Sequence, residues 1–366
     1  MIDKIKINNF RCYGDTQISG FKRINLIGGL NNSGKTVLLE AILLNASPTT
    51  QHIAMLKQLR GEDMDTKELP EYSWDNFFIN QDKTQSISIT TSHSDGKEVN
   101  LTIDCNEEAG EFKQLDNEES EDNDSFQLVL NDFVNDTKVL KSVLHFKYKI
   151  DNKDIPVLTL MAHKKGFNAK ELNVPSSKVA NYIPASSRRK PSILARDYGI
   201  AEKRGKEAVV LDALKIVDKN IDSIKVSVVG GAHLEIRKKG GNFMPVSLFG
   251  DAINKILSIV LTLINNNGTI LLIDEIENGI HHTVQTDFWR FLFELTTTEA
   301  FDVQIFSTTH SLEMMQAFAA ISQKFPNGSA YFELFRRTHT GQIDYNLHDF
   351  ETLNYEISNK LAIRGE

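Results

Sequence analysis

A glycine-rich segment near the N-terminus has residue types and a spacing suited to holding phosphate groups. Gly29, Gly34, Lys35 and Thr36 fit the pattern G-x-x-x-x-G-K-[ST], between an apolar run at 24–27 and a helical pattern. Glycines in such a loop let backbone N–H groups surround phosphate, and the following helix N-terminus adds positive potential. We therefore expect ATP here, with Lys35 near the β- and γ-phosphates and the Thr36 hydroxyl on Mg²⁺.

The residues inside this segment, Asn31, Asn32 and Ser33, complete the expected nucleotide-binding loop. An ordinary glycine-rich turn is the alternative interpretation. A chain of average composition matches the pattern by chance in about one case in a hundred. The apolar strand before the loop and the helix after it strengthen the phosphate-binding interpretation.

Two adjacent carboxylates follow a second apolar run, Leu271 to Ile273. Beside the glycine-rich loop, Asp274 would lie next to the Mg²⁺ ion and Glu275 next to the attacking water. A general base must lie within about 3 Å, or one water, of the proton that it removes. A strand that ends in Asp-Glu is by itself often structural, but together with the loop it predicts a hydrolytic site.

A histidine follows the next apolar run, at 303–306, in the segment STTHS. If that strand lies beside the strand that ends in Asp-Glu, His310 would sit where a group can sense the γ-phosphate. A structural histidine at a strand end is the alternative. We expect His310 to take part in catalysis.

Strand and helix patterns alternate in the two ends of the chain and predict an α/β fold with a mixed, largely parallel buried sheet. The N-terminal residues alternate apolar and polar side chains, which indicates an antiparallel β part. Strands are expected near 5–10, 16–18, 24–27, 269–274, 303–309 and 330–337, a hairpin at Gly230-Gly231, and helices at 35–44, 194–217, 251–265, 281–295, after 311 and over 348–363. These elements place the three candidate segments at strand ends.

Residues 47–180 have a different pattern. The segments SISITT, EVNLTID and VLHFKYKI have a period of two and indicate a β-rich insertion. The expected domains are an ATPase core of residues 1–46 and 181–366 and an insertion of residues 47–180. An acidic run at about 106–124 is expected to be a solvated loop, and the alternative is an acidic segment that attracts a basic partner.

The composition indicates a globular protein, with 40% apolar and 25% charged residues. Its two cysteines, Cys12 and Cys105, lack metal-binding spacing and are expected to be reduced. No signal-peptide pattern is present, and the longest apolar run, Ile256 to Ile264, is about half of the ~18 residues of a membrane span. We expect a cytoplasmic protein without a membrane partner. The formal charge of −8 gives nucleic-acid binding no support by itself, although a local basic groove can coexist with it.

Several longer segments resemble a known family: NNFRCYG, YIPASSR, SLFGDAINKILSIVLTL and LLIDEIENGIHH. They resemble the ABC-type P-loop ATPases of the OLD and AAA15/AAA21-like kind, over roughly residues 1–50 and 180–336. The resemblance implies an ABC-type ATPase head. It also implies that Ser247 and Gly250 are the family's signature residues, which contact the nucleotide bound by the opposite subunit. A homodimer or higher oligomer with the nucleotide sandwiched between subunits would follow. The alternative is a simple cap on the helix at 251–265, with Ser247 or Asp251 as the capping residue.

The resemblance also suggests roles for further positions. Arg11 could approach the nucleotide, but an exposed arginine at a strand end is an equal alternative. Where relatives hold a glutamine that touches Mg²⁺, this chain has 185–187, Ala-Ser-Ser, so either Ser186 takes its place as a metal ligand or a water does. His281 and His282 follow the catalytic glutamate and are expected to be interface or capping residues, not metal ligands.

At the level of the whole protein, the chain resembles the stand-alone ATPase subunits of phage-defence systems such as Septu and PARIS. OLD-type proteins with a nuclease domain of about 100 residues carry it after the ATPase, and only thirty residues follow Arg336. The expectation is a homo-oligomeric ATP-driven switch that regulates a separately encoded effector, a nuclease or toxin. The alternatives are a DNA-clamping ATPase of the repair or chromosome-maintenance type, for which no heptad arms are evident, and a transporter ATPase, whose form of the signature is absent.

Overall fold

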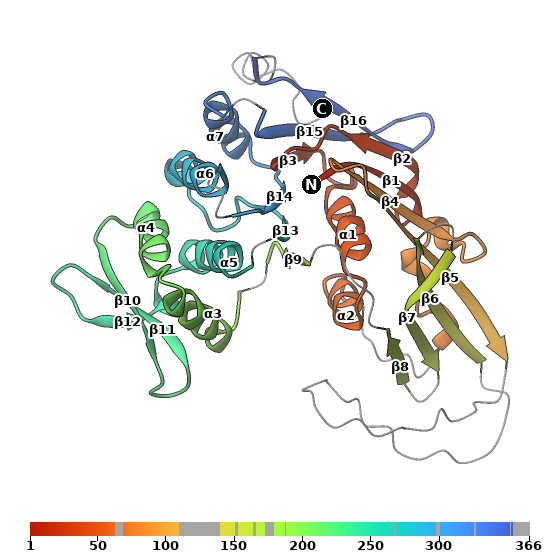
Figure 1. Ribbon diagram of the computed structural model, residues 1–366, viewed down its shortest axis with the longest axis horizontal. Coiled ribbons are helices and arrows are strands. Elements are labelled where there is room, and N and C mark those ends of the chain that lie inside the picture. The colour runs from red at the N-terminus through yellow and green to blue at the C-terminus, as the bar shows by residue number, and fades with distance from the viewer. Residues whose placement is uncertain are drawn as a thin grey trace.

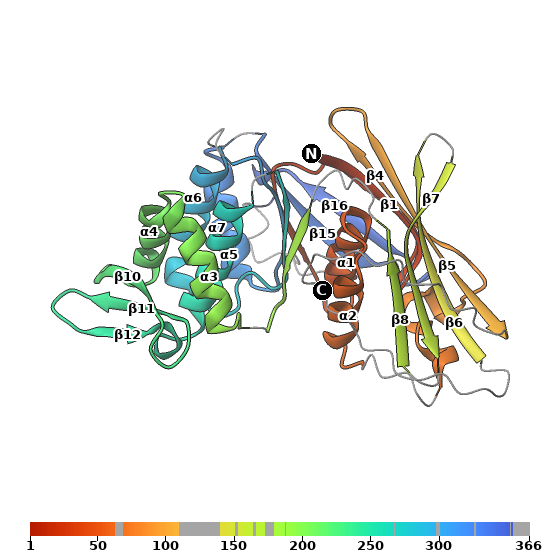
Figure 2. The same cartoon turned by 60° about the horizontal axis from the view of Figure 1, so that its bottom comes forward.

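The computed structural model describes residues 1–62, 69–109, 140–150, 153–163, 166–172, 179–186, 188–266, 268–297, 301–325, 327–351 and 353. Two large sheets, their covering helices and a helical lobe with a third, three-stranded sheet make up this part of the chain (Figures 1 and 2). Residues 106–109 of the acidic run, which was expected to be a loop, form the end of strand β5 (Glu98–Ala109), and the remainder of that run lies outside the described residues. The helix expected over 348–363 also lies mostly outside them.

A six-stranded mixed sheet occupies the centre of the molecule, in the order β16-β15-β3-β14-β13-β9. Neighbouring strands are parallel except β15 and β16. The carboxyl ends of β3, β14 and β13 therefore lie at one edge, where loops of open α/β sheets bind ligands. The strands are β3 (Ile24–Gly29), β9 (Ala180–Ile183), β13 (Ile270–Ile273), β14 (Gln304–Thr308), β15 (Ser329–Arg336) and β16 (Ile343–His348).

A second, seven-stranded antiparallel sheet has the order β2-β1-β4-β5-β6-β7-β8. Its strands are β1 (Ile2–Phe10), β2 (Tyr13–Ser19), β4 (Ile87–His93), β5 (Glu98–Ala109), β6 (Leu140–Ile150), β7 (Lys153–His163) and β8 (Gly166–Glu171). Because β1 pairs with β4, the strands of 47–180 continue the N-terminal hairpin as one sheet. The sequence did not predict this continuity, and the division of the chain at residues 46 and 181 stays a prediction.

Helix α1 (Lys35–Ala46) lies between the two sheets, with α2 (Thr50–Gln58) beside it (Figure 2). Short 3-10 helices follow at η1 (Pro70–Tyr72), η2 (Asp75–Phe77) and η3 (Ile79–Gln81). Ten of the twelve residues of α1 are buried, because both of its faces are covered. The helix that follows the glycine-rich loop is thereby fixed in direction by apolar packing on two sides.

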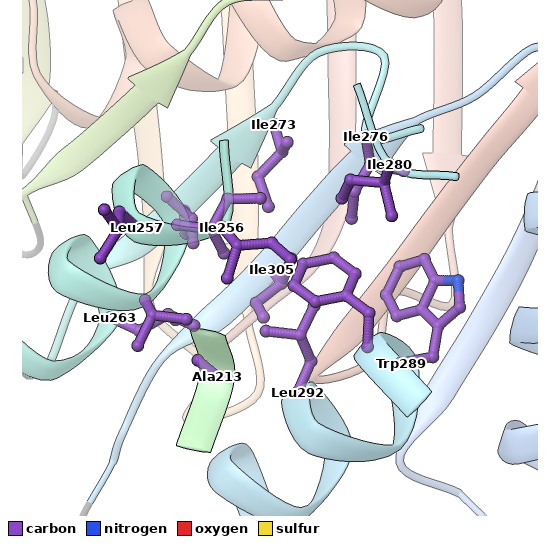
Figure 3. Packing of buried hydrophobic residues seen from close by; sticks show 14 of the residues in the cluster. Ala213, Ile256, Leu257, Leu263, Ile273, Ile276, Ile280, Trp289, Leu292 and Ile305 are labelled. Atoms are coloured by element: carbon purple, nitrogen blue, oxygen red, sulfur yellow. The ribbon is translucent and has the colours of Figure 1, made fainter. Parts of the chain in front are cut away.

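The opposite face of the central sheet carries α5 (Asp251–Asn265), α6 (His282–Thr297) and α7 (Leu312–Ser322) (Figure 1). Alternate residues of each buried strand pack against different helices. Ile273 and Ile305 pack with Ile256 of α5 and Leu292 of α6 (Figure 3), whereas Leu272 packs on the α1 side. This alternation also decides which polar side chains at the strand ends face α1.

A helical lobe packs on α5. It consists of α3 (Pro191–Lys203), α4 (Glu207–Val217) and a three-stranded sheet of β10 (Ile221–Ser227), β11 (His233–Lys238) and β12 (Phe243–Pro245), after which η4 (Val246–Leu248) leads into α5. The expected hairpin at Gly230-Gly231 is confirmed. The helical pattern expected over 194–217 is confirmed, but it forms two helices, α3 and α4, because the chain is interrupted at Gly205, whose φ of 65° is left-handed.

The fold confirms the expected α/β class, with a largely parallel central sheet and an antiparallel N-terminal β part. Within the described part of the chain, no helix has both the length and the apolar character needed to cross a bilayer.

Candidate active site

The glycine-rich loop connects β3 to α1 and surrounds the start of that helix. Asn31 and Asn32 are exposed at its tip, and Asn32 has a left-handed φ of 62°. Gly34, at φ 93°, is the N-cap of α1; its carbonyl accepts a hydrogen bond from the buried Tyr13 hydroxyl at 3.1 Å. The helix has neither a side-chain cap nor an acidic residue in its first turn. Its N-terminal N–H groups are therefore available to an anion.

Lys35 is buried beneath this loop. Its Nζ donates to the carbonyls of Gly29 at 2.8 Å and Leu30 at 2.7 Å. Burial lowers the pKa of Lys35 to about 8, although Asp274 and the nearby glutamates oppose this shift. A phosphate would supply the missing negative partner and favour the charged amine.

The predicted metal-binding pair, Thr36 and Asp274, is in contact. The Thr36 hydroxyl donates to the Asp274 carboxylate at 3.0 Å, and Thr308 at the end of β14 donates to the same carboxylate at 2.6 Å. A threonine hydroxyl and a carboxylate are the hard oxygen donors that Mg²⁺ takes together with phosphate oxygens. The Ser33 hydroxyl is buried in the loop without a hydrogen-bond partner. This donor set fits a Mg²⁺ nucleotide.

Glu275 turns away from the strand with a left-handed φ of 45°. Its backbone N–H donates to the Thr308 hydroxyl at 2.8 Å, and its carboxylate accepts from Asn278 Nδ2 at 2.6 Å. The side chain is 37% exposed. A non-glycine residue in this conformation is strained, and such strain is maintained where the surrounding contacts fix it.

His310 lies next to Glu275, with 3.9 Å between its Nε2 and the glutamate Oε1. Its backbone N–H donates to Glu277 Oε1 at 2.6 Å, which fixes the position of the strand end. Burial, followed by the charge of Lys35, lowers the pKa of His310. The structure therefore brings Lys35, Thr36, Asp274, Glu275 and His310 to one edge of the central sheet.

Three residues of the site had no role in the sequence analysis. Thr308 connects the Asp274 carboxylate to the Glu275 backbone, and it could have been suspected from its place in STTHS. Lys255 of α5 is buried and donates to the carbonyls of Asp274 at 3.0 Å and Pro184 at 3.3 Å. Burial lowers its pKa to about 8. Tyr182 on β9 has a buried hydroxyl, and nothing in its spacing indicated a function.

The proposed signature segment lies apart from these contacts. Ser247 and Gly250 are exposed, and Leu248 beside them is 71% exposed. Helix α5 begins after Gly250, at φ 80°, without a side-chain cap. The alternative of a capping role for Ser247 or Asp251 is therefore not supported.

Two weaker candidates are not brought to the nucleotide site. The Arg11 side chain is buried, forms an ion pair with Glu40 at 2.7 Å and lies against the rings of Phe10 and Phe77. Glu40, inside α1, needs such a counter-charge because burial raises its pKa. Ser186 is exposed, and no hydrogen bond between it and Thr36 or Asp274 is found. His281 and His282 are exposed with their rings 4.2 Å apart.

The AAA domain family matches residues 4–238, which is more than half of the chain. This chain belongs to the AAA domain family. A curated relative from Helicobacter pylori, named ATP/GTP phosphatase, is 25% identical over 86% of this chain and 87% of its own length. The family membership and the phosphate-binding loop make this AAA domain protein an ATPase.

Solved structures with a similar fold include heads of SMC proteins. An SMC head bound to the C-terminal winged-helix domain of ScpA has a TM-score of 0.47 at 10% identity, with 96% of this chain and 98% of that chain covered. The SMC head domain from Thermotoga maritima has a TM-score of 0.39 at 11% identity, with 95% and 99% covered.

Proposed function

We propose that this ATPase hydrolyses ATP with Glu275 as the general base and with Lys35, Thr36, Asp274 and His310 around the phosphates. The observation that carries the proposal is the convergence of the ends of β13 and β14 and the start of α1 on one hydrogen-bonded chain. Thr36 and Thr308 both donate to Asp274, and Thr308 also accepts from the Glu275 backbone. The base is thereby tied to the group that holds the metal.

The residues have separate tasks in this proposal. Lys35 exchanges its two loop carbonyls for phosphate oxygens, and the α1 N-terminus adds backbone donors. Glu275 takes the proton of the attacking water, while a neutral His310 beside it can donate to the γ-phosphate. Mg²⁺, held by Thr36 and Asp274, would neutralise charge that develops on the transferred phosphoryl group.

The Glu275→Gln variant tests this assignment. Glutamine keeps an oxygen that can accept from Asn278, so the loop should keep its shape while the base is lost. We expect unchanged ATP affinity and a rate of hydrolysis about 10²- to 10⁴-fold lower. Glu207→Gln, on the exposed surface of α4, is the matched control. A Glu275→Gln protein that hydrolyses ATP like the wild type would refute the assignment.

The working unit in this proposal is a homodimer with ATP between the copies. The exposed Ser247, the uncapped start of α5 and the exposed Leu248 support it, because they present an anion-favouring helix end and an apolar side chain to solvent. Ser247→Ala should leave ATP binding by the monomer intact and abolish ATP-dependent dimerisation of the Glu275→Gln protein, measured by light scattering. ATP-independent dimers would contradict the sandwich.

The broader role we propose is a switch that binds and regulates a separate effector, a nuclease or toxin, in defence against phage. The extended sheet of β4 to β8 supports this role, because it provides a large surface away from the edge of the central sheet that carries the candidate active site (Figure 1). The test is a pull-down of the Glu275→Gln protein, expressed with its neighbouring genes and analysed by mass spectrometry with ATP and Mg²⁺. A stoichiometric neighbouring protein is expected.

One observation favours the second candidate, a DNA-clamping ATPase. Residues 188–239, which include α3, α4, β10 and β11 of the helical lobe, contain 13 Lys and Arg against 7 Asp and Glu, although the whole chain has a formal charge of −8. Such a local excess can attract a phosphate backbone. DNA binding that weakens steeply with salt, and weakens further after Lys190→Gln and Lys239→Gln, would favour the clamp over the switch.

A further inference from the structure

The hydroxyl of Tyr182 is a buried polar group that has no role in the family pattern or in the proposed mechanism. It lies on β9 directly opposite Leu272 of the neighbouring parallel strand β13. Opposite residues of a parallel pair face the same side of the sheet, and so does the residue two positions further along the strand. Tyr182 therefore shares the α1 face with Asp274, whose carboxylate accepts from Thr36 of α1.

Packing agrees with this register. Tyr182 packs against the apolar cluster that contains Leu272 and residues of α1, whereas its neighbour Ile183 packs in the cluster on the α5 side. The Tyr182 hydroxyl is thus enclosed between α1 and the end of β13. Its oxygen is buried, and burial together with the nearby Asp274 carboxylate raises the pKa of Tyr182, but the hydroxyl makes no hydrogen bond of good geometry within the described part of the chain.

The nearby carboxylates are already engaged. Asp274 accepts from Thr36 and Thr308, and Glu40 pairs with Arg11 and Arg60. A buried hydroxyl without a well-formed hydrogen bond costs free energy, so the geometry leaves Tyr182 available to a group that arrives with the ligand. A phenolic O–H can donate one hydrogen bond and accept another, which suits a water bound to a cation.

The strand end that follows β9 cannot supply this contact. Ser186 is exposed, and the carbonyl of Ala185 accepts a hydrogen bond from Asn278 Nδ2 at 3.3 Å, so residues 185 and 186 lie beside the turn at 275–278. We infer that Tyr182 is a positioning residue of the nucleotide site, whose hydroxyl binds a water ligand of the divalent ion held by Thr36 and Asp274. This inference rests on the proposed function.

The Tyr182→Phe variant of the full-length protein removes only the hydroxyl and should have two opposite effects. Manganese binding in the presence of a non-hydrolysable ATP analogue, measured by electron paramagnetic resonance, should weaken about tenfold, as expected for one hydrogen bond in the shell of a charged ion. The unfolding midpoint in EDTA without nucleotide should equal or exceed that of the wild type, because the buried hydroxyl that is removed makes no well-formed hydrogen bond in the free protein.

Tyr148→Phe is the matched control. The Tyr148 hydroxyl is also buried but donates to the Asn45 carbonyl at 2.7 Å, so its removal should lower the unfolding midpoint without changing manganese affinity. A purely structural role for Tyr182 would give the same result as this control.

The outcomes separate the inference from the proposed function. If the wild type binds manganese with the nucleotide and hydrolyses ATP, but Tyr182→Phe binds manganese equally well or loses stability, the inference fails alone. If the wild type neither binds manganese with nucleotide nor hydrolyses ATP, the proposed function fails. An unfolded Tyr182→Phe protein would show that the hydroxyl is required for folding and would overturn the inference.

Discussion

Asn278 offers a test of how the Glu275 carboxylate is positioned. Its Nδ2 donates to Glu275 Oε2 at 2.6 Å and to the carbonyl of Ala185 at 3.3 Å. Glu275 already has a left-handed backbone, so its side chain depends on such contacts for its direction. Asn278→Ala would leave the carboxylate free to sample other rotamers.

The size of the effect follows from the environment of Glu275. A hydrogen bond to a charged group contributes about 1.5–3 kcal/mol when it is removed from water. The Glu275 side chain is 37% exposed, so water replaces part of the interaction and the lower end of the range applies. A loss of about 1.4 kcal/mol in the transition state corresponds to a kcat lower by about tenfold.

Steady-state hydrolysis provides the assay. We expect kcat to fall and KM to stay within about twofold of the wild type, because the hydrogen-bond partners of Asn278 lie outside the P-loop. Asn346→Ala is the control, since Asn346 makes a similar amide-to-carboxylate hydrogen bond to Glu333 at 3.3 Å on β15. A kcat within twofold of the wild type, or a KM increase with kcat intact, would refute the reasoning.

Two further predictions concern stability. In Gly29→Ala, the added Cβ would lie 2.1 Å from the Leu334 carbonyl oxygen, at a residue whose φ is +129°, so the free energy of unfolding in urea should fall by about 3 kcal/mol. Gly96 has a φ of +83° and open space around it, so Gly96→Ala should lower the free energy of unfolding by only about 1 kcal/mol. Equal losses in the two variants would contradict the steric argument. Lys255 has a folded pKa of about 8, below its ordinary 10.5, so the unfolded chain binds more protons between these values and stability should rise with pH there. Relative to Lys255→Met, the wild type should gain about 2 kcal/mol between pH 7 and 9.5, and parallel pH profiles of unfolding would exclude the buried charge.

The helices and strands that carry the motifs were predictable because their signals are local. The apolar runs before Gly29 and Asp274, and the helix expected at 251–265, appear within one or two residues of their expected bounds. Burial on both faces makes such strands apolar throughout, and this property is visible in a single sequence. The glycine-rich loop likewise indicates phosphate binding through its residue types and their spacing alone.

Contacts between distant segments were not predictable in the same way. Arg11 has a sequence context that fits a nucleotide contact, but in the fold it meets the buried Glu40 and neutralises it. The strands of 47–180 form period-two segments, but only β1–β4 pairing shows that they continue the N-terminal sheet. In both cases the partner lies far along the chain, and no local pattern names it.

By itself, then, the sequence determined that this protein binds a nucleotide phosphate at Gly29 to Thr36 and carries two carboxylates at a strand end. The tertiary structure decided how these groups are connected. Thr308 ties Asp274 to the Glu275 backbone, Lys255 ties α5 to the same strand end, and Tyr182 faces the metal-binding pair from β9. The physical reason is the parallel sheet, whose strand order brings the ends of β3, β14, β13 and β9 to one edge irrespective of their separation in the chain.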